Sequence, residues 1–301
     1  MDFTRKFVKA RRPCADGFRW FIKHYADGGD YQDLLDALVE DGRVGDACWL
    51  LEQFGPTSEV RELDHVDAYA IVFAGTLNVR GGVEVDQLIR AGRGIYVSGG
   101  VRAGHRSQPG TQSGLIAGDD VRVDAGINLV GELRVQGRLR AGWGILVDGT
   151  LNCGSDLYSN WGLECSGSVD VAGNLKPGRE LVVAEDVRCG KSVQVQGPIC
   201  VQGHVSVGHG LLASEGIASG LHIDAGWGIR AGGAIVAAGS LRAGEGIAAR
   251  GPIQTGEGYG VYAGLSVHQD SWQASAKVQA QSCPDRLMSG HWTETASCNE
   301  D

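Results

Sequence analysis

Proline, methionine and long apolar runs are scarce in this sequence. Only 7 of its 301 residues are Pro and 2 are Met, and no run of 18 apolar residues occurs. The missing run excludes a transmembrane helix. The basic start MDFTRKFVKARRP lacks the hydrophobic region that a secretory signal carries. We therefore expect a cytoplasmic protein without a membrane span.

Positive charge is also in short supply, with 27 Lys and Arg against 36 Asp and Glu and a net charge of −9. Direct nucleic-acid binding is therefore not expected, whereas a basic protein partner is compatible with this charge. The 8 cysteines include no close pair with zinc-ligand spacing. Cys153, Cys165 and Cys189 occupy positions where a reduced thiol packs like Ala or Val. We expect no metal and no cofactor.

Glycine is abundant, at 48 residues, and it accompanies a six-residue repeat. Glycine without a three-residue period excludes collagen. Between Leu115 and Val267 an aliphatic residue occupies every sixth position, with Tyr259 as the exception. A small residue follows two positions later and glycine is common in the second half of each unit, as in LRVQGR and LRAGEG. Such a sustained period decides the architecture.

The repeat predicts one short strand per hexad. Alternation within each unit is the two-residue period of a strand with one buried face, and a helical period of 3.6 could not keep the same position inward over so many units. Three hexads would close a coil of about 18 residues, stacked about 4.8 Å above the last. The predicted fold class is mainly β: a triangular, parallel β-solenoid of about ten or eleven coils with a small helical N-terminal domain. Ile127, Leu139, Val187 and Ile229 should then point into the core.

The chain divides into four predicted parts. Residues 1–58 carry helical spacing in FRWFIKHY, YQDLLDALVEDG and DACWLLEQFG, and form a cap or adaptor module. Residues 59–70 are expected as a charged linker. Residues 71–267 form the solenoid, with a polar loop at 104–114 where the register shifts. Residues 268–301 are expected to provide a C-terminal cap and an acidic tail, since an open solenoid end must be covered.

The outward position of each hexad sorts into columns if the coil has 18 residues. One column is unusually apolar for a solvent-facing row, and a contiguous apolar face favours docking of a partner or a second copy. Its members, the predicted interaction face, are Leu146, Val182, Cys200, Ala218 and Val236. A second column is basic, with Arg122, Arg140, Lys176 and Arg230.

Three tryptophans share the fifth hexad position and define a predicted aromatic corner: Trp143, Trp161 and Trp227. Trp143 and Trp161 are 18 residues apart and should stack. Such a pair could grip a ligand or shield the corner glycines. His105 lies in the inserted loop and is the candidate general base if the protein is an enzyme, although nothing acidic nearby in the sequence would orient it.

Two known groups of β-solenoid share this pattern. The ladder at 71–267, as in GELRVQGRLRAG, resembles that of the bactofilins, bacterial cytoskeletal proteins that polymerise. That resemblance implies a structural role. The six-residue period is also similar to that of hexapeptide-repeat acyltransferases, which place a general base in an inserted loop. In those enzymes the small residue is fifth in the unit, whereas here it is third.

Two weaker likenesses extend this comparison. The elongated acidic rod resembles in outline the pentapeptide-repeat proteins that mimic DNA. The helical module resembles small adaptor domains attached to bacterial or phage-borne repeat proteins.

The leading functional hypothesis is a non-enzymatic scaffold, a rigid rod that binds a protein partner or assembles with itself into a homo-oligomer. One alternative is an acidic decoy that inhibits a nucleic-acid-handling protein, of the phage counter-defence type. The other is an acyltransferase that acts through His105.

Overall fold

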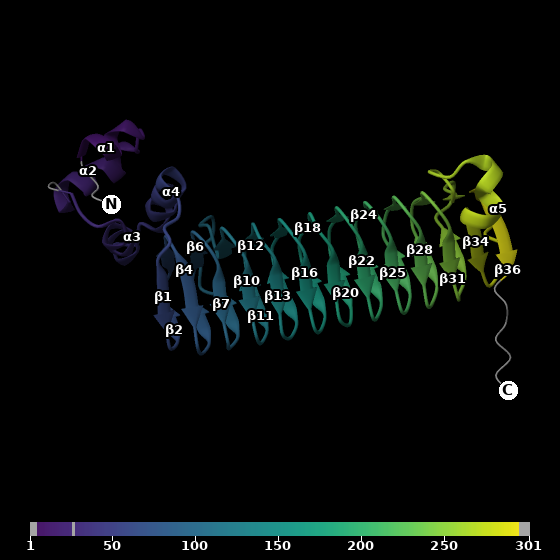
Figure 1. Cartoon of the computed structure of the whole chain (residues 1–301), viewed down its shortest axis with the longest axis horizontal. Coiled ribbons are helices and arrows are strands. Elements are labelled where there is room, and N and C mark those ends of the chain that lie inside the picture. The colour runs from purple at the N-terminus through teal and green to yellow at the C-terminus, as the bar shows by residue number, and fades with distance from the viewer. Residues whose placement is uncertain (1–4, 26–27, 295–301) are drawn as a thin grey trace.

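The protein is a long rod with a helical module at one end and the last described residues at the other (Figure 1). This computed structural model describes residues 5–25 and 28–294. The rod is a parallel β-solenoid of about 13 coils, since its longest sheet has 13 strands. Paired residues lie 18 apart through most of it, as Val121 and Leu139 do. The predicted fold class is confirmed, but the predicted ten or eleven coils were too few.

Three parallel sheets form the sides of the rod. Sheet A contains β1 (Val60–Leu63), β4 (Thr76–Val79), β7 (Ile95–Val97), β10 (Val121–Val123), β13 (Leu139–Ala141), β16 (Leu157–Ser159), β19 (Leu175–Pro177), β22 (Val193–Val195), β25 (Leu211–Ala213), β28 (Ile229–Ala231), β31 (Ile247–Ala249), β34 (Lys277–Ala280) and β36 (His291–Glu294). Sheet B contains β2 (Val66–Ala68), β5 (Val83–Val85), β8 (Val101–Ala103), β11 (Ile127–Val130), β14 (Ile145–Asp148), β17 (Leu163–Cys165), β20 (Leu181–Val183), β23 (Ile199–Val201), β26 (Ile217–Ser219), β29 (Ile235–Ala237) and β32 (Ile253–Thr255). Sheet C contains β3 (Ile71–Phe73), β6 (Leu88–Ala91), β9 (Gly114–Ala117), β12 (Glu132–Val135), β15 (Leu151–Cys153), β18 (Val169–Val171), β21 (Val187–Cys189), β24 (Val205–Val207), β27 (Ile223–Ala225), β30 (Leu241–Ala243), β33 (Val261–Tyr262) and β35 (Leu287–Ser289).

The core is a continuous column of aliphatic side chains inside the three sheets. Ile127, Leu139, Val187 and Ile229 are each at most 2% exposed, so the predicted inward direction is confirmed. Every strand is short, and most show buried, exposed and buried residues in turn. Burial of one aliphatic and one small side chain per strand therefore stabilises the rod along its whole length.

Three cysteines belong to this column. Cys153, Cys165 and Cys189 are buried and unpaired, in the small inward position that the sequence predicts. Each thiol lies close to backbone carbonyl oxygens, such as Gly137 O at 3.4 Å from Cys153 Sγ. Burial raises the pKa of all three thiols. These groups therefore pack as neutral thiols.

Side chains at some corners bind the backbone of the next coil. Asp156 Oδ1 accepts the Asn174 N–H at 2.8 Å, and His222 Nδ1 accepts the Ser240 N–H at the same distance. The residue before each donor is glycine because a Cβ there would overlap the acceptor. At Gly239, for example, a Cβ would lie 2.3 Å from His222 Nδ1.

The helical module consists of α1 (Arg5–Ala10), α2 (Ala15–His24), α3 (Tyr31–Glu40) and α4 (Val44–Phe54). It has no core separate from the rod. Leu34, Leu35 and Leu50 share one apolar cluster with Val72 of β3 and Ile116 of β9. The helices therefore cover the outer side of sheet C near its first strands.

Helix α3 also satisfies the free edge of sheet C. The side-chain amide of Gln32, which is 7% exposed, donates to Val72 O at 3.0 Å and accepts the Ala74 N–H at 2.9 Å. Nearby, Arg61 of β1 pairs with Asp36 of α3 at 3.0 Å. Because an unpaired strand edge invites further strands, Gln32 acts as an edge cap.

The segment 59–70 is not a linker, contrary to the prediction. It contains β1 and β2 and forms the first coil. An arginine takes an inward position here, because Arg61 pairs with Asp36 and lies 4.7 Å from the Phe73 ring centroid. This charged residue interrupts the aliphatic series, so the hexad pattern did not reveal the coil.

The other predicted boundaries differ slightly from the structure. The inserted loop occupies 104–113, since β9 begins at Gly114. The predicted C-terminal cap contains a short 3-10 helix (Gln269–Ser271) and α5 (Trp272–Ser275), and then β34, β35 and β36 extend sheets A and C. Residues 295–301 of the expected acidic tail lie outside the described residues.

Candidate interaction face

The predicted interaction face is a single column along the outside of sheet B. Leu146, Val182 and Val236 are 45%, 42% and 39% exposed. Strand register places Val182 beside Cys200, Cys200 beside Ala218 and Ala218 beside Val236. Glu164 lies between Leu146 and Val182. The column geometry is thus as expected, with one carboxylate inside the apolar row.

Leu146, Val182, Cys200 and Ala218 line a long open groove of about 1050 Å³, and Val236 lies one strand beyond it. The groove extends over the strands from β11 to β26 of sheet B. The groove is hollow because the residues that line it toward β26 are small. They include Ala184, Cys200, Ala218 and Gly220. The lining is largely apolar but includes the carboxylates Asp148 and Glu164, and such a mixture is common in binding surfaces.

One carboxylate without an ion-pair partner, Glu164, lines the groove, and two more, Glu180 and Glu185, lie at the corners of sheet B one coil farther on. Among the described residues, no Lys, Arg or His lies within ion-pair distance of Glu164, Glu180 or Glu185. Glu180 precedes β20 and Glu185 follows it, so the two lie at the corners beside Val182. The hexad pattern does not single out Glu180 or Glu185, which lie at corner positions.

Two of the three predicted corner tryptophans lie together. The rings of Trp143 and Trp161 stack with centroids 6.5 Å apart, and Arg179 lies 5.2 Å from the Trp161 ring centroid. Both indoles are more than half exposed, and they occupy the corner between sheets A and B. They therefore form one edge of sheet B.

Trp227 does not belong to that corner, contrary to the prediction. It lies between β27 and β28, where sheet C meets sheet A, and stacks on His209 with centroids 4.2 Å apart. The reason is numerical: Trp227 is 66 residues after Trp161, which is not a multiple of the 18-residue coil.

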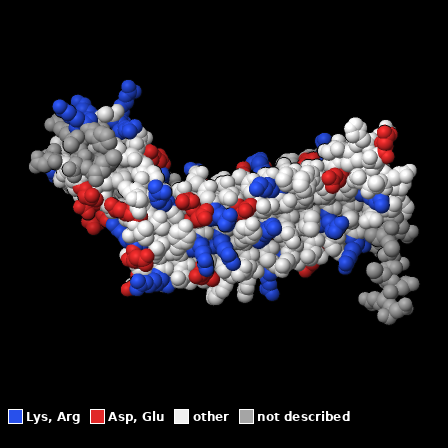
Figure 2. Space-filling view, in the orientation of Figure 1, with Lys and Arg blue, Asp and Glu red and all other residues white. Residues whose placement is uncertain are grey.

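The predicted basic column lies on the outside of sheet A. Arg122 is beside Arg140, and Tyr158 links Arg140 to Lys176 in the register. Arg230 follows farther along, beside Leu212. Lys and Arg recur along the visible side of the rod and gather at the outer end of the helical module (Figure 2).

His105 lies at the edge of the groove, in the inserted loop. Within the described residues its side chain has no hydrogen bond or ion pair. Nor do three or more His, Cys, Asp or Glu side chains in the described ranges form a group that could hold a metal ion.

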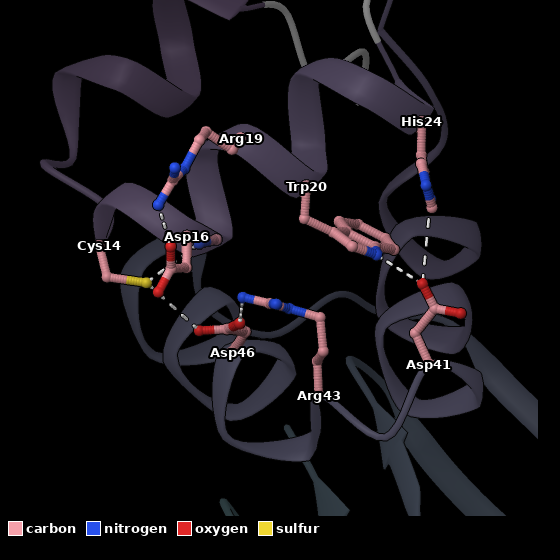
Figure 3. A network of polar contacts seen from close by, with 9 residues as sticks. Cys14, Asp16, Arg19, Trp20, His24, Asp41, Arg43 and Asp46 are labelled. Atoms are coloured by element: carbon pink, nitrogen blue, oxygen red, sulfur yellow. Dashed lines mark hydrogen bonds and ion pairs between the residues drawn. The ribbon is translucent and has the colours of Figure 1, made fainter.

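A polar network within the helical module joins α2 to its neighbours (Figure 3). Trp20 Nε1 donates to Asp41 Oδ2 at 2.5 Å, and the Cys14 thiol lies 3.7 Å from Asp46 Oδ1. Asp46 also pairs with Arg43. These contacts hold α2 against α3 and α4, and we assign them to the stability of the module.

The comparisons with known proteins concern this module. A family model described as the YdhT N-terminal domain matches residues 1–55. No curated protein and no solved structure matches the chain. The described helices include none that is long and apolar enough to cross a lipid bilayer.

Proposed function

We propose that this protein is a non-enzymatic scaffold, a rigid rod whose sheet B groove binds a protein. The observation that carries the proposal is the exposed apolar column Leu146, Val182 and Val236, which follows the groove and continues one strand past its end. Exposed apolar side chains arranged in a row favour an interface over scattered exposure. The proposed location is the cytoplasm, and the bactofilin-like repeat supports a structural role.

The rod suits such a role for two physical reasons. Each coil pairs with the next through backbone hydrogen bonds, so the outward side chains keep fixed spacings over the whole length. A surface that is already ordered loses little conformational entropy on binding. The module at residues 5–54 covers one end and is available as an adaptor.

The test is a pair of charge substitutions in the apolar column, one inside the groove and one just beyond its end. Leu146→Asp and Val236→Asp should abolish association while the circular dichroism spectrum stays that of the wild type, because both side chains point outward. Ser206→Asp, on the outside of sheet C, is the matched control and should leave association unchanged.

Association is measured by light scattering over a concentration series and by affinity purification. The proposal fails if the wild-type protein is monomeric at every concentration and purifies without a partner. It also fails if Leu146→Asp and Val236→Asp associate as the wild type does.

A further inference from the structure

Two faces of the rod carry unpaired charges of opposite sign. On sheet A, no acidic group in the described parts of the chain lies within ion-pair distance of Arg140, Lys176 or Arg230. On sheet B the unpaired groups are the carboxylates Glu164, Glu180 and Glu185, described above.

Sheet C differs from both, since its outward charges are largely paired internally. Arg188 binds Asp186 at 2.9 Å, and Arg242 binds Asp224 at 3.3 Å. Arg122 of sheet A and Arg102 of sheet B are also paired, with Asp124 and Glu84. From β13 onward, the unpaired charges set sheets A and B apart from most of sheet C.

The two faces also differ in side-chain length. The outward column of sheet A is built largely of long residues, such as Arg140, Tyr158 and Lys176. The floor of the sheet B groove contains Cys200 and Ala218. A row of long basic side chains thus has the shape and the charge that a shallow acidic groove accepts.

The spacing of the two faces is the same because they belong to the same coils. Strands β19 and β20 follow each other in one coil, so Lys176 lies at the height of Glu180, Val182 and Glu185. If two rods lie parallel and level, the Lys176 ammonium of one faces the level of Glu180 and Glu185 of the other, one coil from Glu164.

The helical module leaves this contact free. Its apolar cluster includes Val72, Leu88 and Ile116, which belong to strands of sheet C. The bulk of the module therefore packs over the third side of the rod, and it does not cover the acidic groove or the basic column.

We propose that the sheet B groove of one copy receives the basic sheet A face of a second copy. This inference rests on the proposed function and names the occupant of its groove. The two surfaces are different, so the contact is heterologous and each added copy exposes another groove or another basic face. The expected assembly is a side-by-side bundle of rods.

Reversal of one charge on each face tests whether sheet A of one copy binds sheet B of another. We expect wild-type protein to sediment as larger species as its concentration rises in about 0.15 M salt, where distant charges are screened beyond about 8 Å. Lys176→Glu and Glu164→Lys should each weaken self-association by at least about tenfold, because each puts like charges in the contact. An equimolar mixture of the two variants should assemble again, since each then offers the other a complementary face.

Asp170→Lys, an exchange on the outside of sheet C, is the control and should assemble as the wild type does. The inference is overturned if the wild-type protein stays monomeric, if both charge variants still assemble, or if the mixture remains monomeric. If Leu146→Asp abolishes binding of a foreign protein while Lys176→Glu changes nothing, the scaffold role stands and only the second copy is excluded. A partner presenting a basic amphipathic helix would give that result.

Discussion

Replacement of the edge-capping glutamine is the sharpest test of how the rod ends. Gln32→Ala removes the acceptor for the Ala74 N–H and the donor to Val72 O, which lie 2.9 and 3.0 Å from the Gln32 amide. Gln32 is 7% exposed, so both backbone groups lose their partner in a largely buried place. A buried polar group without a partner costs about 1–3 kcal/mol.

Two such groups put the loss at about 2–6 kcal/mol. The loss should act on the docking of α3 against β3. We therefore expect the helical signal at 222 nm to be lost at lower urea concentration, and the Ala74 amide to exchange its hydrogen faster.

The matched control is Gln194→Ala on the outside of sheet A. Gln194 is exposed, and its side chain makes no hydrogen bond within the described residues. The urea midpoint of this variant should stay within about 0.5 kcal/mol of the wild type. A Gln32→Ala protein that unfolds like the control, with an unchanged rate of Ala74 exchange, would refute the capping role.

Three further predictions concern the rod itself. Leu139→Ala, at a fully buried position, should cost about 2–5 kcal/mol in urea unfolding because it leaves a cavity; a change below about 1 kcal/mol would contradict the packed column. Asp156→Ala should cost about 1–2 kcal/mol at neutral pH. Hydrogen bonding from Asn174 lowers the pKa of Asp156 below 3.8, so this contribution is present above that pH and is lost as the pH falls through the folded value. The difference in urea midpoint between variant and wild type should therefore close in acid, and a constant difference would contradict the assignment. Gly239→Ala should destabilise by about 1–3 kcal/mol, because the added methyl group displaces the hydrogen-bonded His222 ring; the cost should shrink in a His222→Ala background.

The fold could be predicted because its main determinant is periodic. One buried aliphatic residue in every six requires only that strands be short and coils regular, and Leu139 and Val187 lie in the core as expected. The same period gave the correct strand neighbours for Val182 and Cys200. Wherever the six-residue period is kept, the sequence alone predicts which residues point inward and which strands are neighbours.

The features that the sequence did not predict, the first coil and its cap, depend on tertiary contacts and not on the hexad period. Arg61 occupies an inward position only because Asp36 and the Phe73 ring receive it, and neither is close to it in sequence. Gln32 lies on an amphipathic helix, and nothing in its neighbours signals that it binds the backbone of β3. No local rule would have placed the first coil or its cap.

For a related reason, the sequence predicted the apolar column of the candidate site but not the groove. The apolar column follows from the 18-residue coil, but the depth of the groove depends on small residues such as Ala184 and Gly220 at a position that the hexad rule does not fix. Glu180 and Glu185 lie one coil after Glu164, so the three carboxylates flank the same part of sheet B only because the chain winds. Counting residues by coil could have found this cluster, and it would have separated Trp227 from Trp161.

Photocrosslinking at two positions of one coil shows whether sheet B is the face that binds protein. Positions 200 and 206 are outward and exposed in consecutive strands, β23 on sheet B and β24 on sheet C. A photoreactive phenylalanine analogue is placed at each position in turn, and the covalent products are compared in the native cell. If sheet B is the binding face, position 200 gives a protein adduct and position 206 gives none. Equal products from both positions, or a product from position 206 alone, would contradict it.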